Sequence, residues 1–275
     1  MFQYALYLQL KETGKDVRID TSMFDFNNSL REYELARVFG ISTEPVDPKK
    51  ASDIRGYGPR DGIIDKIRHR LVKSDIKKFE DPIDRYCEEI ADLDNVLLAG
   101  YWQNLRYFSK AGDKVRQTYT FTGISGETQK VADKMRSEQS VFIHIRRSDY
   151  LSDQNARIYG NICTPEYYEK AISLIKSKVN NPIFYVFCDD ENWAKENVNE
   201  IHESNMTFVD INRNDRSYLD MYLMTQCKHG IIANSSFSWW GAWLGVNKDR
   251  TIICPGRWFN NHETTDMLCE GWFRL

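Results

Sequence analysis

Three short clusters of polar residues carry the side chains that could do chemistry in this sequence. They are HIRRSDY (residues 144–150), CDD (188–190) and NSSFSWW (234–240). Each comes directly after an apolar segment, so each is expected at the end of a buried strand. Polar groups in such a place must be satisfied by one another or by a ligand. The three clusters are therefore the candidates for a binding site.

The first cluster contains the neighbouring arginines Arg146 and Arg147. In a continuing strand, neighbours point to opposite faces, so the two can serve one ligand only if the strand ends near Ile145 and the chain turns. A guanidinium group matches the oxygens of a phosphate with two parallel hydrogen bonds. The cluster thus predicts an anion site. The structural alternative is that Asp149 pairs with one of the arginines.

In the third cluster, Asn234, Ser235 and Ser236 stand between an expected strand and an expected helix. The start of a helix offers free N–H groups and the positive end of its dipole, and serine hydroxyls add donors. This pattern also predicts an anion site. Plain N-capping by the serines is an alternative of nearly equal weight, and Trp239 and Trp243 are expected in the core.

Acidic pairs leave more than one interpretation open. Asp189 and Asp190 could bind a metal, accept hydrogen bonds from guanine or ribose, or cap the helix that begins at ENWAKENV. Asp92 and Asp94, in the sequence DLD, could also hold a divalent metal, with a solvated turn as the alternative. No histidine spacing typical of zinc sites occurs.

The elements that must position these clusters alternate between strand and helix in the second half of the chain. Strands are expected over residues 140–145, 182–190, 207–211, 230–234 and 251–256, and helices over 164–179, 216–229 and 235–245. In the first half we expect helices over 1–14 and 27–40, a strand over 15–20, and an apolar strand followed by an aromatic and polar turn over 95–104. Such alternation predicts an α/β fold with a parallel sheet, in which ligands bind at the carboxyl ends of strands.

Composition narrows the classes of partner and location. The formal net charge is −3, so no global basic field favours nucleic acid. No apolar run within these 275 residues approaches the roughly 20 that a membrane span needs. The six cysteines are scattered without a CxxC pair, which favours a reducing, cytoplasmic location.

One segment runs against the net negative charge. Residues 66–78 hold six Lys or Arg and one Asp. A peripheral contact with an anionic membrane surface, such as the inner membrane, is one interpretation. A solvated helix face is the other.

Taken together, the clusters resemble glycosyltransferase family 11, the family of α-1,2-fucosyltransferases. HIRRSDY resembles its H-x-R-R-x-D-Y motif, and FCDDENW resembles its S-D-D-x-x-W block with cysteine in place of serine. NSSFSWWGAWL resembles its third block, and MFQYA the end of its N-terminal block G-G-L-G-N-Q-M-F-Q-Y-A. The four blocks stand in the family's order and span almost the whole chain. The stretch CKHGIIANSSFSWWGAWLG is most similar to bacterial members.

The resemblance implies a GT-B-type architecture of two Rossmann-like domains with parallel sheets. Residues 1–135 would form the acceptor side, and residues 136–275 would bind the donor. It implies an inverting enzyme that moves L-fucose from GDP-fucose to the 2-hydroxyl of a galactose-type acceptor, in an oligosaccharide or a glycolipid. No metal and no cofactor besides the donor substrate is expected.

The resemblance also implies roles for the clustered residues. Arg146 would stabilise the charge that grows on the leaving phosphate, with Arg147 second in that role, because cationic groups must do this where no metal does. Asp149 is the candidate general base, although a carboxylate beside two arginines is a weak base and could instead orient one of them. The remaining donor-binding candidates are His144 and one of Asp189 and Asp190, for guanine and ribose, and Asn234, Ser235 and Ser236.

One departure from the family pattern prompts an alternative function. The sequence begins inside the N-terminal block, so the first strand and the Gly-rich loop of the family are missing from these 275 residues, and the N-terminal domain is expected to be truncated. The loss would expose the apolar face of MFQYALYLQL. The alternative is a GDP-sugar-binding protein without turnover.

Overall fold

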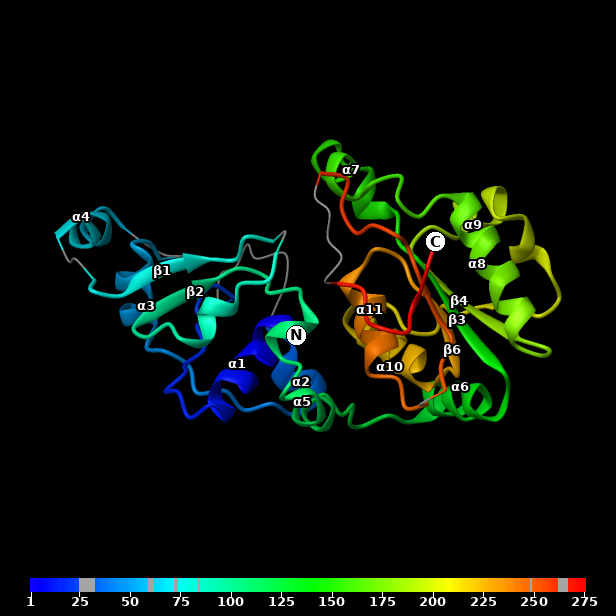
Figure 1. The fold of residues 1–275 in the computed structure, drawn as a ribbon, viewed down its shortest axis with the longest axis horizontal. Coiled ribbons are helices and arrows are strands. Elements are labelled where there is room, and N and C mark those ends of the chain that lie inside the picture. Colours follow the sequence, from blue (N-terminus) through cyan, green and yellow to red (C-terminus); the bar gives the residue numbers. More distant parts are fainter. Residues whose placement is uncertain (25–32, 59–61, 72–73, 84, 248, 262–266) are drawn as a thin grey trace. The chain divides into compact units, whose positions relative to one another are not determined.

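The chain forms two compact units. The structure, a computed structural model, describes residues 1–24, 33–58, 62–71, 74–83, 85–247, 249–261 and 267–275. The units are Met1–Thr122 and Gly123–Leu275, and Figure 1 shows the elements of each. The division falls ahead of helix α6 (Gly126–Ser137), whereas the sequence placed the domain boundary after residue 135. The second unit therefore includes the helix that leads into its first strand.

The second unit is built on a parallel sheet. Its strands are β3 (Ser140–Ile145), β4 (Ile183–Cys188), β5 (Met206–Phe208), β6 (His229–Ile231), β7 (Ile252–Cys254) and β8 (Phe273–Arg274). They lie in the order β5-β4-β3-β6-β7-β8, and every adjacent pair is parallel. Counted from β3, this is the strand order 3-2-1-4-5-6 of doubly wound sheets, in which the chain switches sides between the first and fourth strands. The expected α/β fold with a parallel sheet is confirmed.

Helices cover both faces of this sheet. Besides α6 they are α7 (Asp153–Tyr159), α8 (Pro165–Lys178), α9 (Glu191–Asn197), α10 (Tyr218–Gln226) and α11 (Ser236–Trp243). Figure 1 shows α8 and α9 on one face and α6, α10 and α11 on the other. The alternate residues Val141, Ile143 and Ile145 of β3 pack into the core on the α8 side. All six residues of β3 are buried, which explains its continuous apolar run.

Local sequence signals explain several of these elements. Thr164 caps α8, since its hydroxyl accepts a hydrogen bond from the Tyr167 N–H at 3.4 Å, and Pro165 occupies the first helical position, where its missing N–H costs no hydrogen bond. Gly230 allows β6 to lie close to β3, because a Cβ there would come within 2.2 Å of the Phe142 ring.

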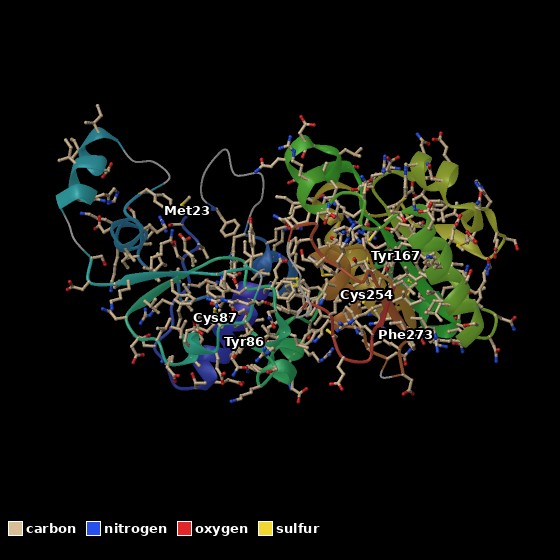
Figure 2. All side chains as sticks on the ribbon, turned by 45° about the horizontal axis from the view of Figure 1, so that its top comes forward. Met23, Tyr86, Cys87, Tyr167, Cys254 and Phe273 are labelled. Atoms are coloured by element: carbon tan, nitrogen blue, oxygen red, sulfur yellow. The ribbon has the colours of Figure 1, made fainter. Side chains whose placement is uncertain are left out.

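Tyr167 ties α8 to the sheet. Its hydroxyl donates a hydrogen bond to the carbonyl oxygen of Ile232 at 2.6 Å, with the Ile253 carbonyl 3.4 Å away. Figure 2 labels this residue together with Cys254 at the end of β7. All six cysteines of the chain are free thiols, as their scattered spacing predicts.

The first unit combines five helices with a small sheet, among the residues the structure describes. They are α1 (Phe2–Glu12), α2 (Leu35–Phe39), α3 (Pro48–Arg55), α4 (Ile63–Leu71), α5 (Gly112–Thr118), β1 (Lys77–Glu80) and β2 (Val96–Ala99). Strands β1 and β2 pair in parallel. Gly40 ends α2 with a left-handed φ of 65°, a conformation that glycine adopts without strain.

Helix α1 is buried, contrary to the expectation that its apolar face would be exposed. Phe2, Leu6 and Leu10 are each less than one tenth exposed. The Phe2 ring lies 6.1 Å from the ring of Phe108, and the hydroxyl of Tyr119 donates a hydrogen bond to the Met1 carbonyl at 2.6 Å. The rest of the first unit therefore supplies a packed surface for this helix.

Other expectations for the first half differ from the structure. Residues 15–20 form no strand, only the isolated parallel bridge between Ile19 and Pro45. The helix expected over 27–40 covers only Leu35–Phe39 of the described residues, and positions 27–32 lie outside them. Among the helices of the described ranges, none has the length and apolar character needed to cross a bilayer.

Candidate functional site

Register brings the three polar clusters to one edge of the sheet. Ile145, the last residue of β3, pairs with Cys188 of β4, and Ile143 pairs with Ile231 of β6. Continued by a few residues, this register sets the segment after β3 beside Asp189 on one side and beside Asn234 on the other. The strand ends at Ile145 and a 3₁₀ helix follows at Ser148–Leu151, so the chain turns where the two arginines required it to turn.

Asp189 holds the loop that carries the arginines. Its carboxylate accepts hydrogen bonds from the backbone N–H groups of Arg147 at 2.9 Å and Ser148 at 3.1 Å. The hydroxyl of Ser148 donates to the Asp189 carbonyl at 3.1 Å. The guanidinium of Arg146 lies 3.3 Å from the same carboxylate. Asp189 thus fixes both the backbone of the loop and one of its cations.

Asp190 has a second pair of roles. One carboxylate oxygen caps α9 by accepting a hydrogen bond from the Trp193 N–H at 3.0 Å. The other oxygen lies 3.4 Å from Nε of Arg147. The guanidinium of Arg147 also sits over the indole of Trp193, 4.6 Å from the ring centroid, in cation–π geometry. Both arginines are about one third exposed and keep part of their surface for a ligand.

Asn234 is buried and forms hydrogen bonds to other segments of the second unit. Its side-chain amide donates to the carbonyl oxygens of Tyr159 at 3.1 Å and Trp258 at 3.2 Å, and its backbone carbonyl accepts from the Tyr150 hydroxyl at 2.8 Å. It is 1% exposed. These bonds join the end of β6 to the 3₁₀ helix after β3, so Asn234 ties together the two loops that flank the switch point.

The start of α11 agrees with the capping interpretation of its serines. Ser235 is the N-cap, and its hydroxyl accepts a hydrogen bond from the Phe237 N–H at 3.3 Å. Ser236 is the first helical residue and is partly exposed. The buried His144 places its ring 5.7 Å from the Phe237 ring, so it faces this helix. Capping does not exclude ligand binding, because the N–H groups of the first turn keep their polarity.

For the candidate base, Asp149, the structure describes the backbone alone. The backbone of Asp149 belongs to the 3₁₀ helix after β3, but its side chain is not among those described. The alternative in which Asp149 pairs with an arginine therefore stays a prediction. The arginine partners within the described residues are Asp189 and Asp190.

A further acidic group, Asp220, which no motif of the sequence singles out, lies at the same edge. Asn212 donates a hydrogen bond to the Asp220 carboxylate at 2.8 Å and accepts one from the Thr128 hydroxyl at 3.0 Å. Thr128 lies near the start of α6 and Asp220 near the start of α10. Both helices lead into the amino ends of strands, so both begin at the carboxyl edge. Burial raises the pKa of Asp220 to about 6.

The acidic pair Asp92 and Asp94 forms a turn. Asp94 lies 3.0 Å from Nζ of Lys15, and Asp92 follows the 3₁₀ helix Glu88–Ala91 as its C-cap. Over the described ranges, no group of three or more His, Cys, Asp or Glu side chains is placed to hold a metal ion. Asp94 therefore has a cationic side chain as its partner.

Trp193 and Tyr150 are site residues to which the sequence interpretation assigned no role. Trp193 stacks with Arg147, and Tyr150 bonds to Asn234. The sequence could have indicated both residues, because Trp193 is the last residue of the FCDDENW block and Tyr150 is the last residue of HIRRSDY.

Comparison with known proteins shows the family to which this chain belongs. The sequence model of "Glycosyl transferase family 11" matches residues 67–274. The "Alpha-1,2-colitosyltransferase" of Escherichia coli is 39% identical over 100% of this chain and 94% of its own length. The "O-antigen biosynthesis glycosyltransferase WbnK" of Escherichia coli is 35% identical over 48% of this chain and 43% of its own. The human "Galactoside alpha-(1,2)-fucosyltransferase 1" is 27% identical over 58% of this chain and 47% of its own. This chain belongs to glycosyltransferase family 11, as a bacterial member, and is an enzyme of the fucosyltransferase type.

Proposed function

We propose that this enzyme transfers L-fucose from GDP-fucose to the 2-hydroxyl of a galactose-type acceptor, with inversion and without a metal. The observation that carries the proposal is the pair Arg146 and Arg147 at the carboxyl end of β3. They lie at the switch point of a doubly wound sheet, with the start of α11 at the end of the neighbouring strand β6. Ligands of such sheets bind at this point.

The proposed reaction explains why two cations stand there. The acceptor oxygen forms a bond to C1 of fucose while the bond from C1 to the phosphate oxygen breaks, and GDP leaves with the electron pair. Negative charge grows on the leaving phosphate. Arg146, braced by Asp189, is the principal group that stabilises this charge, and Arg147 assists it. The acceptor proton passes to a base, for which Asp149 is the candidate.

The other residues of the site support the donor in different ways. His144, Ser235 and Ser236 contact the nucleotide in this proposal. Asp189 and Asp190 are already bonded to protein groups, but a carboxylate has about four lone-pair positions, so one of them can still accept from guanine or ribose. Both donor hydrogens of the Asn234 amide bond to protein carbonyls. Asn234 therefore supports the site by holding its loops in place and donates no amide hydrogen to the donor substrate.

In this proposal each substrate is assigned to one of the two units. We assign the donor to the second unit and the acceptor side to the first, in a GT-B-like arrangement. The acceptor is a galactose-terminated oligosaccharide or glycolipid. The binding-only alternative is less well supported, because the relatives that match this chain are named as transferases.

One observation favours a second donor. The relative that covers the whole of this chain is named a colitosyltransferase. Colitose is fucose without the 3-hydroxyl, so the leaving group and its arginine contacts are unchanged, and the two donors differ only at one position of the sugar.

The experiment is a donor comparison with purified protein. GDP release is measured with GDP-fucose and with GDP-colitose over a panel of galactose-terminated acceptors, and the linkage of the product is determined by NMR. We expect transfer of fucose in an α-1,2 linkage that persists in EDTA. Transfer of colitose alone would replace the proposed donor, and loss of turnover in EDTA would reject the metal-free chemistry. Tight GDP binding without any transfer would support the binding-only alternative.

A further inference from the structure

Helix α4 of the first unit exposes three isoleucines. Ile63 is 78% exposed, Ile64 is 81% exposed and Ile67 is 53% exposed. The first two are the most exposed large apolar side chains among the residues that the structure describes. Single exposed apolar residues are ordinary, but three on one short helix form a patch that needs a reason.

The three isoleucines form one face of the helix. Successive residues of an α-helix are about 100° apart around its axis, so these three fall within an arc of about 100°. Asp65 and His69 lie on the opposite side by the same periodicity. Helix α4 is thus amphipathic, with its apolar face toward solvent.

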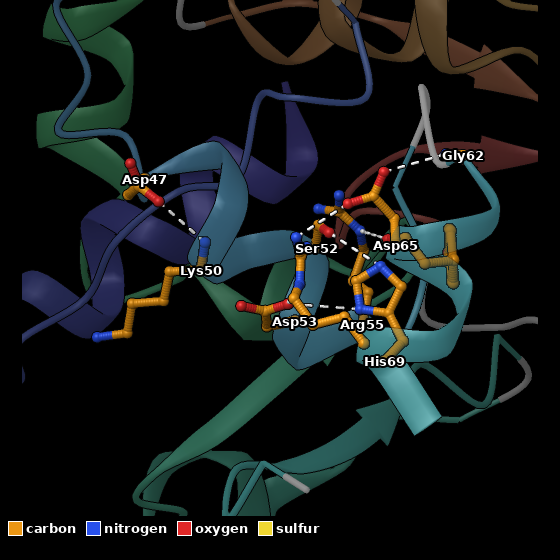
Figure 3. Close-up of polar contacts among 10 residues, drawn as sticks. Asp47, Lys50, Ser52, Asp53, Arg55, Gly62, Asp65 and His69 are labelled. Carbon is orange, nitrogen blue, oxygen red and sulfur yellow. Dashed lines mark hydrogen bonds and ion pairs between the residues drawn. The ribbon is translucent and has the colours of Figure 1, made fainter. Parts of the chain in front are cut away.

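Among the α4 side chains that the structure describes, polar ones hold the helix to the rest of the protein. Nε of Arg68 lies 2.9 Å from the carboxylate of Asp53, and Nε2 of His69 lies 3.2 Å from the hydroxyl of Ser52, both on α3. Figure 3 shows this contact between the two helices. Asp65 adds an ion pair to Arg68 at 2.9 Å. An ordinary surface helix packs through its apolar face, so the orientation of α4 is reversed.

Charge next to the patch indicates what covers it. The segment 66–78 that contains the second half of α4 holds six Lys or Arg and one Asp, in a chain whose net charge is −3. Lys77 and Lys78, at the start of β1, are exposed. An exposed apolar face beside a basic run is the pattern of helices that lie in the interface of an anionic bilayer.

We propose that α4 docks this protein on the surface of an anionic phospholipid bilayer. Ile63, Ile64 and Ile67 enter the boundary between headgroups and acyl chains, and the exposed lysines Lys77 and Lys78 contact the phosphates. A second copy of the chain is a poorer occupant, because a stable protein interface uses roughly 20–30 residues on each side and this patch offers three isoleucines.

Vesicle binding tests the proposal. Purified protein is sedimented with phosphatidylcholine vesicles that contain or lack phosphatidylglycerol, at low and high salt. We expect binding to the anionic vesicles that weakens with salt. Combined substitution Ile63→Ser, Ile64→Ser and Ile67→Ser should weaken it at least roughly tenfold, since the inserted apolar area is lost. Serine is chosen because its helix propensity is close to that of isoleucine.

Two further variants serve as controls. Val246→Ser with Tyr101→Ser removes exposed apolar side chains outside α4 and should leave vesicle binding unchanged. Lys77→Gln with Lys78→Gln should reduce binding at low salt only. These two lysine substitutions and the lipid preference of the unaltered protein test the proposal even if the triple variant fails to fold.

Three outcomes would overturn the proposal. One is no preference of the unaltered protein for anionic vesicles, and another is unchanged binding of the folded triple variant. The third is a concentration-dependent dimer in light scattering that the triple variant abolishes, because that would identify a second copy as the occupant. Turnover of a water-soluble acceptor should be equal in the triple variant and the unaltered protein, so the test is independent of the proposed transfer reaction.

Discussion

At the scale of residues, the donor-site candidates include two neighbouring ion pairs of arginine and aspartate. Arg146 pairs with Asp189 and Arg147 with Asp190, while each carboxylate also accepts backbone N–H bonds. The two charges of each sign compensate one another. An arriving diphosphate therefore meets cations whose positions are already set, which is the condition under which electrostatic stabilisation is most effective.

The substitution Arg146→Ala tests the main cation. We expect kcat to fall about 10²–10³-fold, equivalent to about 2.7–4 kcal/mol of barrier, because the leaving phosphate loses its principal partner. GDP should also bind more weakly. The kcat of Arg146→Lys should lie between those of Arg146→Ala and the unaltered protein. Lysine keeps the positive charge but cannot form the two parallel hydrogen bonds of a guanidinium group. The measurements are steady-state kinetics and GDP titration.

Arg136→Ala is the matched control for this substitution. Arg136 is partly exposed and pairs with Asp133, but it lies in the last turn of α6, which leads into the amino end of β3, so its loss should leave kcat unchanged. Near-normal turnover of a folded Arg146→Ala protein would rule out the assigned role.

The sequence predicted which residues form the site better than it predicted which of them pair with one another. Two arginines after an apolar run indicate an anion site, and the structure places them at the switch point. Their described partners are Asp189 and Asp190, more than 40 positions away, because the register of β3 against β4 brings these residues level. Such a register is not visible in the order of residues along the chain. Pairing of an arginine with Asp149, which is near in sequence, was the structural alternative to an anion site and stays a prediction.

At the scale of elements, two of the capped helices of the second unit allow a controlled comparison. Thr164 caps α8 and Asp190 caps α9, and only the second cap also pairs with an arginine. We expect Thr164→Ala and Asp190→Ala each to lower the free energy of unfolding by about 1 kcal/mol. Only Asp190→Ala should weaken GDP binding. Urea unfolding measures the stability of both variants, and titration calorimetry measures their affinity for GDP. Equal loss of GDP affinity in both variants would show that the effect passes through stability alone.

Strands were more predictable than helices for a physical reason. A strand of a parallel sheet that is covered on both faces must be apolar along its length, and β3 and β4 show this clearly. Short polar helices such as α3 and α7 carry no comparable signal, and α7 has no buried residue. Strand β8 has two exposed residues and was not expected.

At the scale of the whole molecule, the buried carboxyl of Asp220 links stability to pH. Its pKa is raised to about 6 in the fold from 3.8, so the folded protein binds more protons between these values, and stability falls as the pH rises from about 4 to about 6. Asp220→Asn should therefore unfold with a free energy higher by about 1–3 kcal/mol at pH 8, and the gain should disappear near pH 4. Urea titrations across this range provide the measurement. A gain of equal size at both pH values would point to a cause other than ionisation.

The burial of β3 has a consequence for the order in which the second unit opens. Its six residues are buried and it is paired with β4 and β6 on its two sides. Amide protons of such a strand exchange with solvent only through global unfolding, whereas those of a helix without buried residues, such as α7, exchange through local opening. The two arginines directly follow β3. We therefore expect the end of β3 that carries them to stay paired with its neighbours while α7 opens, and to separate only when the sheet itself unfolds.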